Sequence, residues 1–476
     1  EPWMKSASRA AKLSNLKLRF SYGVAGNNNV ELGALNSDYV MTNDNVYLSP
    51  EAFENTSYYL SAGGSEKIEP NNDLKWETTT TRDLGLDYGF FKDRLSGALD
   101  LYWNSTDDLI IKYKLPTVGY QYRNVAETKN LGVEFSVKGI ILDKQSKNLN
   151  YDLTVDANIS ANKNTVVSLG GMDKYYVSTR YLGSGNYTTD EFIVEEGQSI
   201  GRIYGFESDG YYTTDDFSSY DAQNKKWLDA SGNAIELPYS ILGSAYPGLI
   251  KIKDINGDGQ ITSDDRKVIG CTMPMFTGGF SISGHVGGEN WGSVDAALNF
   301  TYSYGNDVLN LTGMSMTMIQ NKTKFRNTLS STANRYSMFN ANGEYIPDNF
   351  ATSGIVSGAD YDALALALAN NNKSASDFNP VMGENLLTDK FVEDGSFLRL
   401  ANMTVGYSLP EKWISKAHIT KARIFFTASN LFVLTKYTGS DPEVDTGTKR
   451  NPLAIGVDWS AYPKSRAFNF GVNLSF

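Results

Sequence analysis

Twelve consecutive residues, 254–265, place side-chain oxygens at the spacing of a calcium-binding loop. Oxygen donors stand at the first, third, fifth, ninth and twelfth positions, and glycine stands at the sixth, where the chain must turn sharply. The seventh residue of such a loop donates its backbone carbonyl. The pattern therefore predicts one bound Ca²⁺ with these ligands: Asp254, Asn256, Asp258, the Gln260 carbonyl and Asp265, with Thr262 contributing directly or through water.

The same residues also fit a polar turn that needs no metal, because Asn and Asp side chains accept hydrogen bonds from the backbone of their own loop. If calcium binds, we expect oxygens at about 2.3–2.6 Å from the ion. We also expect a structural role at an extracellular position, where a millimolar affinity is sufficient. Both interpretations stay open at the level of the sequence.

Other reactive side chains are few. The two histidines, His285 and His418, lie far apart, and His285 falls on the polar side of an alternating segment, which favours a lining role over a catalytic one. Cys271 is the single cysteine, so an intramolecular disulfide and a multi-cysteine metal site are excluded, and we interpret it as a small packing residue. No Ser, His and Asp constellation stands out, and 278–279 lacks the strand–loop–helix setting of a phosphate loop. We therefore expect a protein that is not an enzyme.

Composition favours strands and argues against nucleic acid as a partner. The chain of 476 residues has a net charge of −11, whereas phosphate binding needs clustered Lys and Arg. Aromatic residues make up 12% of the chain, and 43 glycines suit an architecture rich in strands and turns. No segment approaches the about 18–20 apolar residues of a membrane-spanning helix. The alternating strands of a membrane β-barrel would escape such a search, because their mean hydropathy is moderate.

Alternation of apolar with small or polar residues is the strongest signal in the chain. In 83–90, for example, Leu84, Leu86, Tyr88 and Phe90 alternate with Asp and Gly. The pattern predicts about ten strands with these spans: 16–26, 78–90, 95–113, 128–142, 151–168, 275–287, 292–305, 396–409, 422–437 and 466–476. Their length exceeds the about five or six residues of an average strand and suits a tilted crossing of a bilayer.

The last strand shows the cleanest alternation, so its register is well determined. We expect it to face lipid with Phe468, Phe470, Val472, Leu474 and Phe476 and to end at the periplasmic side. Aromatic residues near other strand ends are candidates for interfacial belts. They are Trp3, Trp103, Trp291, Trp413 and Tyr407.

The connections between the predicted strands are unequal. Short turns alternate with long polar loops, which span about 27–76, 169–274, 305–394 and 438–464, with a shorter loop at 115–126. Short turns on one side and long loops on the other are typical of outer-membrane barrels. The loop 169–274 contains the calcium-type segment 254–265, and the loop 305–394 contains a helix expected at 359–370 from its Ala and Leu content.

The predicted fold is therefore an all-β, antiparallel transmembrane β-barrel over residues 1–476, with long extracellular loops. Ten strands alone would leave open edges in lipid, so we expect further strands to complete the barrel. The alternative is a secreted, calcium-stabilised β-sandwich that serves as a carbohydrate-binding module or adhesin.

Eight segments together resemble the barrel of the SusC/RagA group of TonB-dependent transporters. They are 16–23, 122–125, 130–134, 200–205, 276–280, 393–400, 437–442 and 462–466. Each is weak by itself, but they occur in the family's order and cover nearly the whole chain.

The resemblance implies the C-terminal part of a 22-stranded barrel, with the plug domain and the earlier strands absent from this sequence. It implies import of an oligosaccharide or, less favoured, an oligopeptide across the outer membrane of Bacteroidetes-type bacteria. It also implies a SusD-like lipoprotein lid and TonB, which would act through the missing N-terminal part. Tyrosines in the long loops suit contacts to sugar, peptide or lid alike. They are Tyr175, Tyr176, Tyr181, Tyr211, Tyr212 and Tyr220.

Overall fold

Ten long strands follow the alternating segments. In the computed structural model they are β1 (Leu13–Asn27), β3 (Glu77–Phe90), β4 (Leu95–Lys114), β5 (Tyr120–Lys144), β6 (Asn150–Leu169), β15 (Phe276–Gly288), β16 (Gly292–Tyr304), β20 (Phe397–Ser408), β21 (Lys421–Thr435) and β23 (Ala467–Ser475). The ten predicted strands are confirmed. Only β5 begins much earlier than expected, and its first residues, Tyr120 and Gln121, pair in parallel with the short strand β2 (Ile68–Glu69).

The structure describes residues 12–28, 68–114, 120–146, 148–179, 181, 190–236, 244–259, 261–317, 328–350, 354–376, 387–449 and 451–476. The chain divides into two compact units. The first comprises Glu1–Val137, Asn162–Tyr175 and Glu195–Ser199, and the second comprises Lys138–Ala161, Tyr176–Val194 and Ile200–Phe476. Strands β5 and β6 contribute residues to both.

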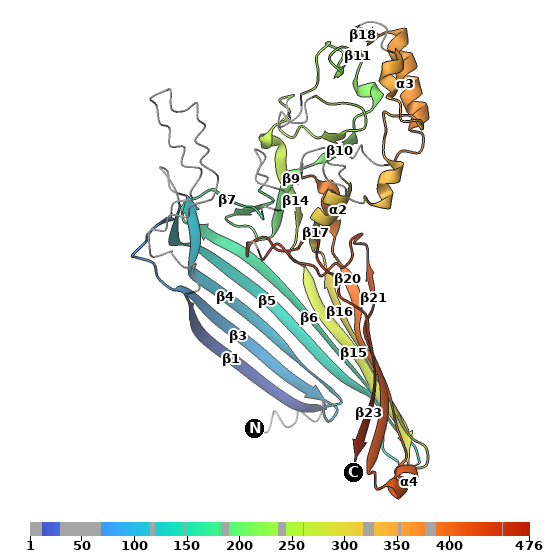
Figure 1. The fold of residues 1–476 in the computed structure, drawn as a ribbon. Helices are drawn as coiled ribbons and strands as arrows, with labels where there is room; N and C mark the ends of the chain where they lie inside the picture. Colours follow the sequence, from blue (N-terminus) through green and yellow to red (C-terminus); the bar gives the residue numbers. More distant parts are fainter. Residues whose placement is uncertain are drawn as a thin grey trace, which may run out of the picture. The chain divides into compact units, whose positions relative to one another are not determined.

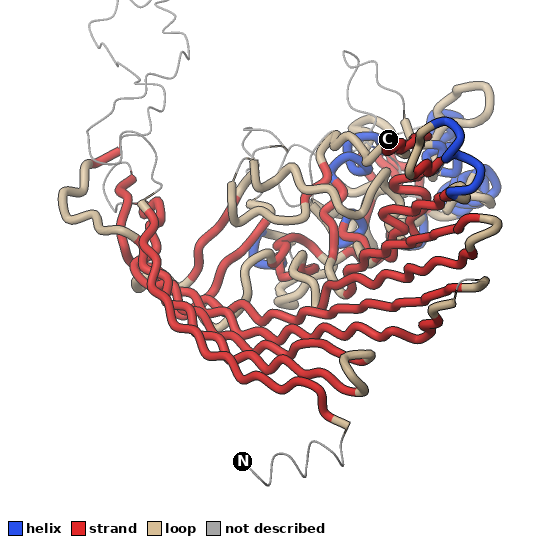
Figure 2. Tube along the Cα trace, turned by 90° about the horizontal axis from the view of Figure 1, so that it is seen from below, coloured by secondary structure: helices blue, strands red, loops and turns tan. Residues whose placement is uncertain are grey.

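Hydrogen bonds join the long strands in the order β1-β3-β4-β5-β6-β15-β16-β20-β21-β23. The strands lie side by side within each unit (Figure 2), and consecutive ones such as β3 and β4 or β15 and β16 are antiparallel. Residues 91–94 and 289–291 form short turns at one end of these strands. In the second unit, the longer connections lie at the opposite end from α4 (Glu411–Ile414) (Figure 1).

Two tyrosine side chains pack over glycines of the adjacent strand and hydrogen-bond to the strand beyond it. Tyr88 on β3 lies opposite Gly97 on β4, and its hydroxyl donates to a backbone carbonyl of β5 at 3.1 Å. Tyr302 on β16 lies opposite Gly278 on β15 and donates to a carbonyl of β6 at 2.8 Å. A Cβ atom on either glycine would meet the tyrosine within 2.7 Å, so only glycine permits this contact.

Shorter elements occupy the two long connections. Between β6 and β15 they are β7 (Lys174–Val177), β8 (Phe192–Glu195), β9 (Arg202–Phe206), β10 (Ser208–Tyr211), η2 (Thr214–Asp216), β11 (Ser219–Asp221), β12 (Lys226–Leu228), β13 (Ile250–Ile252), η4 (Ser263–Asp265) and β14 (Arg266–Cys271). Between β16 and β20 they are β17 (Asp307–Asn310), α2 (Leu311–Thr317), η5 (Ser330–Asn334), η6 (Ile346–Phe350), β18 (Ile355–Ser357), α3 (Ala359–Asn371), η7 (Asp389–Phe391) and β19 (Val392–Asp394). η8 (Ser415–Ala417) follows α4, and β22 (Val457–Asp458) precedes β23.

We call the second-unit residues of these two connections, together with β22, the loop region. Its small sheets have the orders β10-β13, β12-β11-β18 and β19-β17-β22. A further sheet, β14-β9-β8-β7, also includes first-unit residues of β7 and β8. Trp227 and Tyr220, 2% and 0% exposed, pack ring to ring at 4.9 Å and form a core with Tyr361 of α3. The loop region therefore has a water-excluding core of its own.

The predicted helix at 359–370 is confirmed as α3, which lies beside β18 and β11 (Figure 1). Leu364 and Leu368 of this helix are fully buried by the chain itself. Leu366, by contrast, is 63% exposed and faces outward. The helices α2 and α4 were not expected, since their sequences show no apolar stripe at helical spacing.

Candidate functional site

The long strands carry large apolar side chains on one face that the chain itself leaves uncovered. Leu18 on β1 is 70% exposed, and Phe470 on β23 is 82% exposed. The antiparallel register continues this face across neighbouring strands, as in the pairs Ile282 with Leu298 and Ile424 with Val472. A β-sandwich would cover such a face with a second sheet. Its exposure suits hydrocarbon as the neighbouring medium.

The opposite face is polar and carries ion pairs. In the first unit, Arg19 on β1 reaches over Gly85 on β3 and donates to Asp100 on β4 at 2.7 Å. Its Nε also donates to Asp87 at 3.0 Å. A Cβ atom on Gly85 would meet the guanidinium within 2.7 Å, so the glycine makes room for the bridge.

The second unit contains the same arrangement, in which an arginine crosses a glycine to bind a carboxylate two strands away. Arg423 on β21 reaches over Gly406 on β20 and binds the carboxylate of Asp295 on β16 through Nε at 2.9 Å. His285 lies on this polar face, as its position in the alternation predicts, and Nδ1 contacts the Asp152 carboxylate. These are cross-strand contacts between lining residues, and they form no nucleophile–base pair of the kind that catalysis requires.

The loop 254–265 is organised by two carboxylates. Asp265 is fully buried and accepts backbone N–H bonds from Ile255 at 2.8 Å and from Thr262 at 2.7 Å. Asp254 accepts from Gly257 at 2.6 Å and from a further loop amide. Although burial opposes ionisation, the backbone amides of Thr262, Ile255 and Asn256 hold the pKa of Asp265 below its ordinary value.

The structure brings together some of the predicted ligands but not all. Asp254 and Asp265 are neighbours, while Asn256 bonds instead to Asp258 at 3.1 Å. Gln260 lies outside the described residues. In the described parts of the chain, no group of three or more His, Cys, Asp or Glu side chains is close enough to hold a metal. Any ion here would depend on amide, hydroxyl or carbonyl oxygens besides two carboxylates.

A second loop with the same local structure shows what is unusual about Asp265. Thr213 and Asp216 form a reciprocal cap at η2, as Thr262 and Asp265 do at η4. Asp216 is neutralised by Lys251 at 2.6 Å. Among the described residues, no lysine or arginine makes an ion pair with Asp254 or Asp265. Among the residues that the structure describes, the carboxylates at η4 therefore have no counterpart of Lys251.

Cys271 and the tyrosines divide into buried and accessible groups. The Cys271 thiol is half-buried on β14, and its backbone N–H donates to Asp307 at 2.8 Å. Tyr212 and Tyr220, at 5% and 0% exposure, serve as core residues and cannot contact a ligand. Tyr176 is 44% exposed, and Tyr211 is half-buried at a cavity. Alternation and composition could not separate these groups, because burial depends on distant segments.

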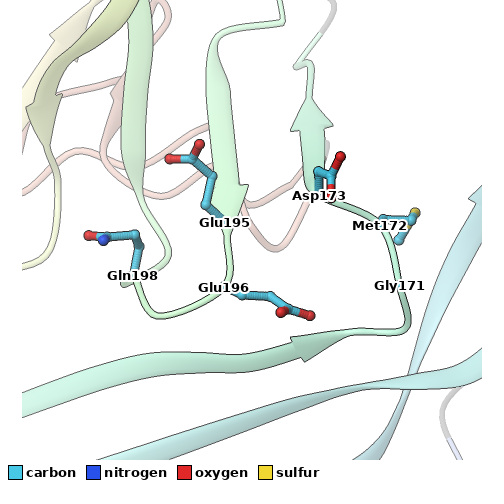
Figure 3. A pocket seen from close by; sticks show the side chains of 6 residues that line it. All are labelled: Gly171, Met172, Asp173, Glu195, Glu196 and Gln198. Carbon is cyan, nitrogen blue, oxygen red and sulfur yellow. The ribbon is translucent and has the colours of Figure 1, made fainter.

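A cavity of about 380 Å³ adjoins the start of β7 in the first unit (Figure 3). It is lined by Gly171, Met172, Asp173, Glu195, Glu196 and Gln198. Glu196 accepts the Leu169 N–H at 2.7 Å, and Glu195 pairs with Lys174 at 3.4 Å. Because two of its three carboxylates bind groups of the chain itself, the acidity of the cavity does not define a site.

Three of the segments that carry the family resemblance meet around one buried arginine. Arg399 on β20, whose side chain is 5% exposed, donates to Asp441 at 2.5 Å and to Glu443 at 2.7 Å. Lys464 also binds Glu443, at 2.7 Å. These residues belong to separate sequence motifs, and the sequence alone did not predict that they form one network of ion pairs.

Comparison with known proteins agrees with this geometry. Residues 12–236 match the family described as TonB dependent receptor-like, beta-barrel. TonB-dependent receptor P3 of Formosa agariphila is 28% identical over 479 residues, which are 98% of this chain and 40% of that protein. TonB-dependent receptor SusC of Bacteroides thetaiotaomicron is 27% identical over 485 residues, 98% of this chain and 38% of that protein.

A solved structure shares the fold. The RagAB peptide transporter superposes with a TM-score of 0.64 at 23% identity, over 98% of this chain and 41% of that one. Among the described residues, no helix has the length and apolar character needed to cross a membrane.

The two-faced antiparallel sheet is thus that of an outer-membrane β-barrel, and the chain is similar to TonB-dependent receptors. More narrowly, the chain is similar in sequence to SusC and shares the fold of the RagAB transporter. The chain spans about two fifths of the length of the relatives it matches.

Proposed function

We propose that this chain forms the C-terminal part of a barrel that imports an oligomeric nutrient across the outer membrane, with energy from TonB. The observation that carries the proposal is the sheet with one apolar and one ion-paired face, which suits a wall between lipid and a polar passage. An oligosaccharide is the favoured cargo, and an oligopeptide is the alternative. The relatives matched here are named receptors and transporters, which supports transport over catalysis.

The proposed partners follow from the SusC/RagA resemblance. A SusD-like lipoprotein would cover the mouth formed by the long connections, and TonB would act on the part of the protein that the relatives have beyond this match. The outward face of α3, with Leu366, is the proposed contact to the lid. Cysteines introduced at Leu366 should crosslink to the lipoprotein in intact cells, whereas cysteines at the buried Leu364 should not.

Growth of the source bacterium tests the import function. A strain without this transporter, or without TonB, should fail to grow on the oligosaccharide taken up by the wild type and should grow normally on the corresponding monosaccharide. Restoring the full-length gene should restore growth. Equal growth of the deletion strain on every oligosaccharide and oligopeptide supplied would contradict the proposal.

We also propose that residues 254–265 bind one Ca²⁺ in a structural role. Support comes from the neighbouring carboxylates of Asp254 and Asp265, which no described cation balances, and from the oxygen-rich spacing around them. The ion would draw Asn256 and Asp258 into the same shell. Calcium would then neutralise the carboxylates at η4, as Lys251 neutralises Asp216 at η2.

Calcium titration of the folded, full-length protein tests this site. Millimolar Ca²⁺ should raise the unfolding temperature of the loop region, and Asp254→Asn should abolish the increase. Asp264→Asn is a matched control, because Asp264 is exposed in the same loop and is not a proposed ligand. An unchanged unfolding temperature, together with no ion in an anomalous-scattering map, would show that the loop is a metal-free turn.

A further inference from the structure

A small polar cavity lies in the loop region beside β10. Its volume is about 250 Å³. It is lined by Ser208, Gly210 and Tyr211 of β10, Ile250 of β13, Ser376, and Asp389 and Lys390 of η7. All of these residues belong to the second unit, although they come from four separate parts of the chain. We call it the β10 cavity.

The walls of the β10 cavity are held in place by the chain itself. Asp389 Oδ1 accepts the Ser208 N–H at 2.9 Å and the Ser208 hydroxyl at 2.6 Å. Tyr211 is paired with Ile250 across β10 and β13, and the Ser376 N–H donates to a backbone carbonyl at 2.9 Å. Preorganised groups of this kind lose little freedom when a ligand binds.

The lining of the β10 cavity has a distinct chemistry. Asp389 Oδ2 receives no hydrogen bond from any residue that the structure describes, so this oxygen keeps its capacity to accept. Tyr211 adds a half-buried aromatic ring, in contrast to the fully covered Tyr220. Lys390 brings a positive charge next to the carboxylate, so the lining as a whole is balanced in charge.

We infer that the β10 cavity is a subsite for one sugar unit of an oligosaccharide, an inference that rests on the proposed import function. A neutral ring with several hydroxyl groups can donate to Asp389, accept from neighbouring donors and pack its apolar face on Tyr211. A free cation or anion would gain little from a balanced lining. The cavity is smaller than the about 300–1,000 Å³ of sites for whole drug-sized ligands, so it holds one unit and not the full oligomer.

Binding by the full-length transporter in detergent tests the subsite. Isothermal titration with maltohexaose, laminarihexaose, xylohexaose and cellohexaose should find at least one ligand. Tyr211→Ala and Asp389→Asn should each weaken its affinity at least about tenfold. Tyr211→Phe keeps the ring and should retain most of the affinity. Tyr176→Ala is the matched control, because Tyr176 is an exposed loop tyrosine outside the cavity and its loss should leave the affinity unchanged.

The outcomes separate this subsite from the import function. Unchanged oligosaccharide affinity in both Tyr211→Ala and Asp389→Asn would overturn the subsite. TonB-dependent uptake of hexapeptides without any oligosaccharide binding would also overturn it, while import itself would stand. Oligosaccharide binding that is lost in both variants would support the subsite even if no TonB-dependent uptake were found, and only the import proposal would then fail.

Discussion

The sheet and the loop region place their large apolar side chains in opposite environments. On β1 and β23 these side chains point away from the chain, as the 82% exposure of Phe470 shows. In the loop region they close on one another, as Trp227 and Tyr220 do. The chain thus has an apolar surface that suits contact with hydrocarbon and, separately, a packed core that excludes water. The difference shows that large apolar side chains can be shielded from water in two ways. Lipid shields them in the sheet, and other side chains of the protein shield them in the loop region.

The largest expected effect tests self-packing in the loop region. Leu364→Ala should cost about 2–5 kcal/mol, because it leaves a cavity at a fully buried position of α3. Leu366→Ala on the same helix should cost less than about 0.5 kcal/mol, since that side chain is 63% exposed. Limited proteolysis of the loops reads out the difference. Equal protease resistance of the two variants would contradict a packed core around α3.

The next effect tests the lipid-facing surface. Val472→Arg on β23 should cost about 2–4 kcal/mol if the side chain lies near the bilayer midplane. Asn473→Arg should be milder, because it lies on the polar face beside Arg423 in the register. Folded barrel is measured by heat-modifiable gel mobility.

Gly471, which alternation alone would also choose as the mild position, is a poor control. A Cβ atom there would meet the Phe425 ring within 2.9 Å, so any side chain would clash. Equal losses of folded barrel for Val472→Arg and Asn473→Arg would overturn the assignment of the two faces.

A smaller effect tests the ion-paired face. Gly406→Ala should cost about 1–3 kcal/mol, because its methyl group would push the Arg423 guanidinium away from Asp295. Adding Arg423→Ala should remove most of the clash, so the double variant should lose less than the sum of the two single variants. Additive losses in urea unfolding from lipid vesicles would show that glycine is not needed for the bridge.

The smallest effect compares the two capped loops. Asp216→Asn should cost no more than about 1 kcal/mol, because the pair with Lys251 is partly exposed to solvent. Burial opposes the ionised form of Asp216, but the bond from Lys251 and the Thr213 amide lower its pKa below the ordinary 3.8. The wild type should therefore keep this stabilisation above that pH and lose it as pH falls through the lowered pKa. Unfolding of the loop region in the variant should lack this acid-dependent step.

Much of the wall could be predicted from the sequence because its determinants are local. A strand between lipid and a polar passage must alternate apolar and polar residues. The lipid-facing side of Phe468 and Val472 can therefore be predicted without knowing which strands lie beside them. The helix α3 was predictable for the same reason, since its Ala and Leu content favours a helix over the chain's own length. Spacing alone also identified the oxygen-rich segment 254–265.

Only the tertiary structure decided which side chains meet. The alternating pattern places Arg19 and Arg423 on the polar face, but their carboxylate partners depend on strand order and on a glycine in the strand between. Tyr211 and Tyr220 look alike in the sequence, yet one lines a cavity and the other is sealed in a core. The two Thr-to-Asp caps are equally alike, and only folding gives Asp216 a lysine and Asp265 a second carboxylate. Alternation predicts whether a residue faces lipid or the polar side, because it depends only on local sequence. The side chains that a residue contacts depend on segments far away in the chain.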